Sequence, residues 1–520
     1  MPETSPIVRP AVNPWIVAVS VMFATFMEVL DTTVVNVSLP HIAGSLSSSV
    51  DDATWALTSY LVANAIVLPI TGWMANYFGR KRLLIAAVAG FTAASFLCGL
   101  AQSLPMLILF RTLQGASGGA LQPLSQAVLL EAFPPQERGK AMAFWGLGIV
   151  VAPMLGPVLG GWLTDNYSWR WVFYINIPIG VAGIVMMNLF IFDPPYIRRI
   201  AGKIDFWGIG MLAVGIGALQ ILLDKGQEDD WLSSRFIATL GVVCAVSLLV
   251  FLIHELTTAR PVVDLRVFKA RTYSAGVFLM TVLGFVLYGS LVLLPIWLQT
   301  LMGYPALQAG YAMAPRGLGS FLAMPVMGAL MAKADARKLL FLGIAGSAFT
   351  LFQLSRLNLS AGYWDFFWPQ FIQGVALALL FVPLTTTTMD SIPNAQMGNA
   401  TSIFNLMRNI GGGVGIAAST TMVARAEQAN INRLGERFNA FNPQAGALMG
   451  GLRNTFMAGG SGYVTASRQA YVTVFRMVEG QAAILSFVRI FRLLALIFLA
   501  VIPVLLLMKR PARRRVTAPH

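Results

Sequence analysis

Charged side chains are scarce in this sequence. Asp, Glu, Lys and Arg make up 11% of its 520 residues, whereas 57% are hydrophobic. Soluble domains usually carry about 25% charged residues, so a water-soluble enzyme or binding domain of this length is excluded. With a mean hydropathy of +0.70, most of the chain must have lipid as its solvent.

Cysteine and histidine are equally rare. Cys98 and Cys244 are the only cysteines, and both fall in apolar runs, which excludes a disulfide framework and a thiolate metal site. His41, His254 and Glu255 have no neighbours with metal-ligand spacing. The sequence also lacks an HExxH pair, a nucleophile elbow and a P-loop. We therefore expect neither enzyme activity nor a metal or cofactor, and no direct use of ATP.

Long apolar runs are abundant instead. A helix needs about 20 apolar residues to cross a bilayer, and fourteen segments approach that length. The first run is too long for a signal-peptide core and should remain as a helix. The sequence therefore predicts an all-α integral membrane protein with 14 transmembrane helices, near 15–38, 53–76, 83–103, 105–131, 140–163, 169–192, 205–224, 235–256, 272–300, 308–332, 338–357, 363–389, 397–424 and 489–508.

The two halves of the chain repeat each other. Residues 72–90 align with 328–346, and the segment FRTLQG at 110–115 aligns with PQFIQG at 369–374. An internal repeat in so apolar a chain is typical of transporters whose halves rock about a central site. We expect an N-terminal six-helix bundle (1–200), two additional helices (201–260) and a C-terminal six-helix bundle (261–520).

The net charge of +14 raises the possibility of a nucleic-acid partner, but its distribution argues against one. Most of the basic residues fall in alternate loops and at the termini, which is the positive-inside pattern and predicts cytoplasmic termini. These residues are Arg9, Arg80, Lys81, Arg82, Arg138, Lys140, Arg198, Arg199, Lys203, Arg260, Arg266, Lys269, Arg271, Lys333, Arg337, Lys338, Lys509, Arg510, Arg513, Arg514 and Arg515.

The first predicted span carries two acids, Glu28 and Asp31. Their spacing of three places both on one helical face. Two carboxylates so close in a low dielectric do not both ionise easily, which suits a proton carrier. A structural pair with a buried arginine is the alternative.

Arg111 lies within the fourth span and is a candidate partner for that acid. A fixed positive charge can hold an empty carboxylate ionised and release it when a proton or a cationic substrate arrives. The repeat places Gln370 opposite Arg111, so we expect proton handling in the N-terminal half. An arginine that reaches the membrane surface is the alternative.

Further candidates line a predicted central cavity between the bundles. Arg316 and Arg408 are intramembrane cations that could meet an acidic substrate group or Asp390, or else satisfy backbone carbonyls. Aromatic residues and methionines in apolar helices most often serve packing, so the others are weaker candidates. The remaining candidates are Gln114, Tyr288, Trp297 and Met313.

The fifth span is rich in small residues and proline. Gly146, Gly156, Gly160 and Gly161 would let another helix approach closely, and Pro153 with Pro157 permits a bend. Close packing alone would also explain the pattern.

A long connection separates the last two spans, at about 425–488. It is polar and rich in Gly and Asn, and we expect a loop on the non-cytoplasmic side. Such loops are usually functional or disordered, so both a flexible loop and a docking surface for a periplasmic partner are open.

These segments together resemble the major facilitator superfamily, specifically its fourteen-helix drug:proton antiporter family. The resemblance covers nearly the whole chain. Motif D matches Leu30 to Val37 with Pro40, and motif A matches Gly72 to Arg82, including Gly79, Arg80 and Lys81. Motif B matches Arg111, Gln114 and Gly115, and the antiporter motif C matches Gly156, Pro157, Gly160 and Gly161.

The resemblance implies roles for several residues. Asp31 would be the proton-coupling carboxylate and Arg111 its relay partner, while motif A would latch the bundles on the cytoplasmic side. The usual motif A aspartate is Asn76 here, which puts a charged latch at that position in doubt. The segment NAFNP at 439–443 is similar to EmrB-type pumps, which join a periplasmic membrane-fusion adaptor and an outer-membrane channel.

The sequence therefore predicts an inner-membrane exporter of drugs or other amphipathic compounds, driven by the proton gradient. Neighbouring acids on the first span would suit cationic drugs, whereas Arg316 and Arg408 would suit weak acids. A proton-coupled importer of a small nutrient is the first alternative. A membrane-embedded enzyme or receptor is the second, although a two-half repeat has no obvious role there.

Overall fold

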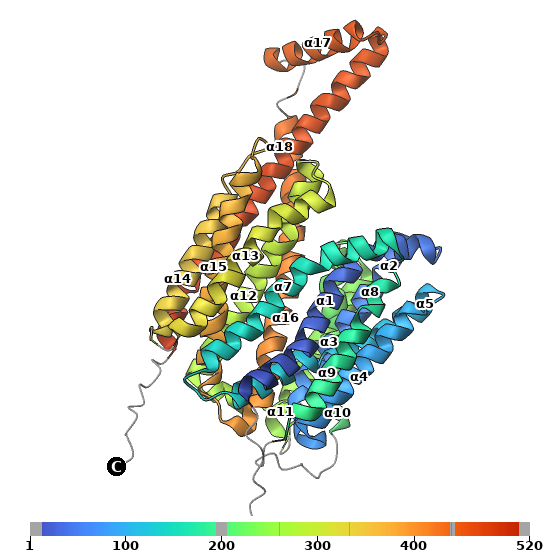
Figure 1. The fold of residues 1–520 in the computed structure, drawn as a ribbon. Helices are drawn as coiled ribbons and strands as arrows, with labels where there is room; N and C mark the ends of the chain where they lie inside the picture. The colour runs from blue at the N-terminus through green and yellow to red at the C-terminus, as the bar shows by residue number, and fades with distance from the viewer. Residues whose placement is uncertain are drawn as a thin grey trace, which may run out of the picture.

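The computed structural model describes residues 13–193, 205–258, 261–331, 333–436, 438 and 442–508. Within these residues the regular structure is entirely helical, as expected (Figure 1). The first bundle contains α1 (Pro14–Ser45), α2 (Val50–Ala53), α3 (Trp55–Phe78), α4 (Arg80–Gly99), α5 (Leu104–Gly118), α6 (Leu121–Ala132), α7 (Arg138–Asn166), α8 (Trp171–Tyr174) and α9 (Asn176–Phe190).

The remaining helices form the additional pair and the second bundle. The pair is α10 (Phe206–Lys225) and α11 (Arg235–Thr257). The second bundle contains α12 (Arg271–Ile296), α13 (Ala306–Leu330), α14 (Ala336–Leu354), α15 (Tyr363–Met389), α16 (Met397–Gly435), α17 (Pro443–Ala458) and α18 (Tyr463–Ala500). The predicted domain boundaries at 200 and 260 lie outside the described residues.

Ten helical segments of the described chain are long and apolar enough to cross a membrane. The other four predicted spans coincide with α5–α6, α13, α14 and α16, which do not reach that length or hydropathy. The chain breaks between α5 and α6 at Gly119 and Ala120, so neither piece is long enough alone. The all-helical membrane fold is confirmed, and the count of fourteen spans stays a prediction.

The sequence repeat corresponds to repeated helix packing. Gly115 on α5 approaches the carbonyl of Tyr60 on α3, and Gly374 on α15 approaches the carbonyl of Arg316 on α13. In each bundle an added Cβ would collide with that backbone. The matching glycines therefore hold matching helix pairs together, and Arg316 is the structural counterpart of Tyr60.

The two bundles meet at the end that carries the loops of Arg80, Arg138 and Lys333, which we call the basic end. There a Cβ on Gly72 of α3 would lie 2.6 Å from the backbone of Asn399 on α16. A Cβ on Gly328 of α13 would lie 3.0 Å from that of Lys140 on α7. Toward the opposite end, the far end, the bundles splay apart (Figure 1). The bundles are thus in close contact at the basic end and separate toward the far end.

The predicted polar loop at 425–488 is wrong in its secondary structure. Helix α16 continues to Gly435, and most of the rest belongs to α17 and the first part of α18. The segment NAFNP lies largely outside the described residues. Helix α17 and the start of α18 project past both bundles at the far end (Figure 1). The described part of this segment is therefore a helical extension and not a coil.

The additional pair contacts both bundles near the far end. The Asp224 carboxylate accepts a hydrogen bond from Thr58 on α3. After α10, the Trp231 indole donates to Thr421 Oγ1 on α16 at 3.0 Å. The pair is therefore packed into the molecule and is more than a linker.

Candidate functional site: a buried carboxylate cluster on the first helix

Helix α1 carries both predicted acids into the protein interior. It begins at a side-chain cap from Asn13 and runs for 32 residues. Glu28 is 5% exposed and Asp31 is 1% exposed. The prediction that the two acids share one helical face agrees with their common burial, although their partners differ.

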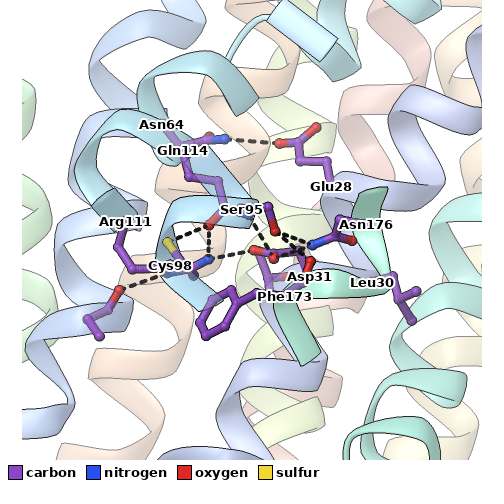
Figure 2. A network of polar contacts seen from close by, with 12 residues as sticks. Glu28, Leu30, Asp31, Asn64, Ser95, Cys98, Arg111, Gln114, Phe173 and Asn176 are labelled. Carbon is purple, nitrogen blue, oxygen red and sulfur yellow. Dashed lines mark hydrogen bonds and ion pairs between the residues drawn. The ribbon is translucent and has the colours of Figure 1, made fainter. Parts of the chain in front are cut away.

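Asp31 is surrounded by hydrogen-bond donors (Figure 2). Arg111 Nη1 lies 2.6 Å from Asp31 Oδ2. Gln114 Nε2 and Asn176 Nδ2 donate to Asp31 Oδ1 at 2.9 and 2.8 Å. Helices α5 and α9 thus supply one cation and two amides to one carboxylate, all from the first bundle.

Arg111 is completely buried, so the alternative of a surface-seeking arginine is wrong. Its Nε donates to the Ala56 carbonyl at 3.1 Å, and its Nη1 also donates to Gln114 Oε1 at 2.8 Å. The guanidinium carbon lies 4.2 Å from the centre of the Tyr60 ring. These contacts hold the cation in place whether or not Asp31 is charged.

A second layer orients the amides. Asn176 Nδ2 also donates to Ser95 Oγ at 3.0 Å, and Ser95 donates to the Phe173 carbonyl at 2.8 Å. Cys98 Sγ lies 3.6 Å from Gln114 Oε1. The cluster can therefore present either a charged or a neutral Asp31 to a fixed set of donors. A proton on Asp31 would compete directly with Arg111.

Glu28 has a different environment, one turn closer to the N-terminus of α1. Asn64 Nδ2 donates to its Oε1 at 3.0 Å, and Gln122 of α6 lies beside the same carboxyl. Gln122 Oε1 in turn accepts a hydrogen bond from Arg408 of α16. Gln122 therefore lies between Glu28 and Arg408 of the second bundle, and Glu28 Oε2 itself makes no hydrogen bond to any described residue.

The other predicted cavity residues fall into two groups. Trp297 is fully buried in a cluster with Phe366, Phe487 and Phe491. The prediction that Trp297 lines a substrate cavity is therefore wrong, because this side chain packs inside the second bundle. Tyr288 and Met313 are half-buried, and their predicted role stays a prediction.

Arg316 is buried inside the second bundle, where Nη2 donates to Ser290 Oγ at 3.3 Å. Among the described residues no carboxylate pairs with it. The expectation that Asp390 would meet Arg316 or Arg408 is wrong, because Asp390 Oδ1 pairs with Arg138 Nη1 at 3.0 Å.

Part of the fifth-span pattern is explained by contact between α7 and α1. A Cβ on Gly156 would collide with Thr33, and one on Gly160 would lie 2.7 Å from the Val34 carbonyl oxygen. Gly161 has no comparably close neighbour. Pro153 and Pro157 both lie inside α7. The close approach places α7 directly against the acid-bearing helix.

A groove of about 360 Å³ lies where α7 meets α13 and α15. Its lining is almost wholly apolar and includes Met154, Leu155, Leu318, Phe321 and Phe367. Pockets for drug-sized ligands usually measure about 300–1,000 Å³ and have such linings. The sequence gives no indication of this groove, because its residues come from three helices that are distant along the chain.

Motif A forms part of the contact at the basic end. Gly79 has φ +91°, a conformation that favours glycine. Arg80, which is buried, forms an ion pair with Glu131 and donates to the Asn394 carbonyl of the second bundle at 3.4 Å. The Lys81 amide donates to Asp193 at 2.8 Å. Glu131 and Asp193 thus supply carboxylates to a motif in which Asn76 replaces the usual aspartate.

Arg138 completes this contact. It donates to Asp390 and, at 3.4 Å, to Asn394 Oδ1. Burial raises the pKa of Asp390 above its usual 3.8, although Arg138 lowers it in part. The closed end therefore combines glycine packing with the polar contacts of Arg80 and Arg138.

Sequence reasoning missed several polar members of the cluster, namely Asn64, Ser95, Gln122 and Asn176. Asn176 stood in an otherwise apolar segment, YINIPIG, where a polar amide requires a buried partner. This single amide among apolar residues was the one feature of the sequence that could have pointed to Asn176. Nothing in the sequence showed that Gln122 lies between Glu28 and Arg408.

Comparison with known proteins agrees with the fold and with the motifs. Residues 21–416 match the family model of the Major Facilitator Superfamily. The chain is 40% identical to the multidrug export protein EmrB of Escherichia coli (strain K12), over 95% of each chain. It is 39% identical to the fatty acid resistance protein FarB of Neisseria gonorrhoeae, over 95% of this chain and 96% of that one.

Among solved structures, the human organic anion transporter MFSD10 (TETRAN) superposes with a TM-score of 0.60. The match covers 95% of this chain and 99% of the other at 13% identity. At that identity the likeness concerns the fold alone.

Proposed function

Because this chain belongs to the major facilitator superfamily, and within it to the EmrB-type transporters, we propose that it exports multiple amphipathic compounds in exchange for protons. The observation that carries this proposal is the Asp31 cluster. Its buried carboxylate can bind either a proton or Arg111, and it lies on α1, which packs against α7. A ligand shifts a conformational equilibrium only if it binds two states differently, and a charge change at Asp31 provides such a difference.

In the structure the bundles are closed at the basic end, which the positive-inside pattern assigns to the cytoplasm. This is the outward-facing state, in which substrate leaves and a proton reaches Asp31. Protonation weakens the ion pair with Arg111 and favours the inward-facing state, where substrate binding expels the proton.

The substrates are hydrophobic or amphipathic. The apolar groove between α7, α13 and α15 supports this, because it lies at the bundle interface and accepts a ligand of drug size. Glu28 would favour cationic compounds, and Arg316 and Arg408 would favour anionic ones. The fatty acid resistance of the relative FarB is consistent with an anionic class.

We further propose that the chain works in a tripartite assembly in the inner membrane of a bacterium. The projecting part of α18 exposes Tyr463, Val464, Tyr471, Val472 and Phe475. Exposed apolar patches of this kind usually mark protein interfaces. A periplasmic adaptor that reaches an outer-membrane channel is the partner that fits a projection on this side.

Transport in sealed vesicles tests the proposal. Purified protein is reconstituted, a pH gradient is imposed, and a fluorescent cation and a fluorescent fatty acid are followed. We expect movement of the compound against the direction of proton flow, abolished in Asp31→Asn with protein levels unchanged. Movement in the same direction as protons would support the importer instead.

A further inference from the structure

The structure contains a second concave site, formed by α16 and α18 of the second bundle, whereas Asp31 lies in the first. This groove measures about 810 Å³. Its apolar lining includes Met422, Leu485 and Leu496, which are 40%, 47% and 61% exposed. Arg425, Arg489 and Arg492 complete it.

The three arginines give the groove a strong positive charge. All three are exposed, and no ion pair joins any of them to an acid within the described part of the chain. An arginine beside an apolar wall without an acidic partner requires water or an anionic ligand.

The depth of the groove matches a lipid headgroup. From Arg489 the chain continues as α18 to Ala500 and then as a 3-10 turn at Ile502–Leu507. At about 1.5 and 2.0 Å per residue this amounts to roughly 30 Å, the thickness of the hydrocarbon core. Strongly basic sequence follows Met508 and fits the opposite membrane surface. The arginines therefore lie at the headgroup level of the far end.

The two helices are joined at the outer end of the groove, because Asn430 of α16 donates to Ser486 Oγ of α18 at 3.0 Å, level with the lining residue Leu485. Leu493 and Leu496, which also line the groove, lie one to two turns beyond Arg489 in the apolar part of α18. A bound molecule would have its charge at the arginines and its chain along these leucines.

We propose that this groove binds an anionic phospholipid of the leaflet at the far end, with its phosphate on Arg425, Arg489 and Arg492. The arginines recognise the headgroup because guanidinium groups bind phosphate oxygens in pairs. A lipid here would couple α16, which carries Arg408, to α18, which carries the projecting extension.

Native mass spectrometry of the full chain tests this, with phosphatidylglycerol and phosphatidylcholine of matched acyl chains as probes. The variant is R425Q/R489Q/R492Q. The matched control is R433Q/R468Q/R476Q, which removes the same charge from exposed positions of the same two helices outside the groove.

We expect wild type and control to prefer phosphatidylglycerol, and the groove variant to lose that preference by about tenfold or more, because basic side chains at the membrane surface attract anionic headgroups. Equal loss in the control would overturn a localised site, as would an unchanged groove variant. Dodecanoate that displaces the lipid from wild type at equimolar ratio would overturn the phospholipid in favour of a fatty-acid site.

Thermal unfolding of each variant without added lipid distinguishes loss of binding from misfolding. A groove variant that unfolds like the control while it loses the preference supports the site. If it unfolds earlier, the single variant Arg492→Gln replaces it, and an unchanged preference there contradicts the proposal.

Discussion

Two acids one turn apart on α1 have different surroundings. Asp31 receives an ion pair from Arg111 and two amide hydrogen bonds, all from its own bundle. Glu28 has Asn64 and, through Gln122, Arg408 of the other bundle. The first arrangement lies within one bundle, whereas the second reaches from one bundle to the other. We infer that Asp31 responds to protons and Glu28 to the position of the bundles.

The largest effect on the difference between Asp31 and Glu28 should come from removing the cation beside Asp31. Arg111→Met leaves a buried carboxylate unpaired, which costs about 3–5 kcal/mol when a buried pair loses one partner. We expect export to be lost and thermal stability to fall. Transport assays and thermal unfolding measure the two effects.

Arg111→Lys is the matched variant, because it keeps the charge but not the bonds to Ala56 and Gln114. It should recover stability in part and export poorly. Full export by Arg111→Met would show that Asp31 needs no counter-charge.

A smaller effect should follow from Glu28→Gln. The amide retains the size and can still bond to Asn64, so folding should be preserved. We expect export of cationic compounds to fall several-fold and that of fatty acids to change little, as measured by a drug-sensitivity panel. Glu427→Gln on the far-end part of α16 serves as the control. An equal loss for both substrate classes would place Glu28 in proton coupling with Asp31.

A double-mutant cycle can test whether Glu28, and not Asp31, depends on Arg408 of the other bundle. Residues that share a neighbouring side chain, here Gln122, show coupling of about 0.5–3 kcal/mol in double-mutant cycles. We expect Glu28→Gln and Arg408→Gln to be non-additive in thermal stability of the closed form. Asp31→Asn with Arg408→Gln should be additive. The reverse pattern would assign the cross-bundle link to Asp31.

The smallest expected effect concerns Asp390 at the basic end. Its pKa is raised by burial in the closed form. Opening should expose this carboxyl to water and return its pKa toward 3.8, so we expect the closed form to bind the proton more tightly. Closure is therefore favoured as pH falls through the range just above 3.8 and is weakened as pH rises through the raised value. For a partly exposed pair the change should stay below about 1 kcal/mol.

Distances between spin labels across the basic end, recorded over that pH range, measure this dependence. Asp390→Asn should remove it. A dependence of the same size in the variant would assign it to another group.

Much of this arrangement could be predicted from the sequence, because hydropathy fixes where helices lie and an internal repeat fixes which ones correspond. Intramembrane charge pointed to Glu28, Asp31 and Arg111, since ionisable groups at that depth are costly. The partners could not be predicted: Asn176 and Gln122 are distant along the chain, and only packing brings them to the acids. Trp297 illustrates the same limit, because the sequence does not distinguish an aromatic residue that lines a cavity from one that packs in a core.

The helices of the segment between the last two predicted spans could not be predicted from the sequence either. The segment after Thr421 is polar and rich in glycine, which favours a loop. Its helices are nevertheless formed, with the Asn442 side chain capping α17 and Asn430 bonded to α18. Tertiary contact overrides local propensity there.

The most direct test measures proton release on substrate binding. Purified protein in weakly buffered detergent is mixed with a transported compound, and a pH-sensitive dye records the protons released. The account predicts release by the wild type, in a pH-dependent amount, and none by Asp31→Asn, which still binds the compound. Equal release by wild type and Asp31→Asn would contradict it, because the proton would then come from another group.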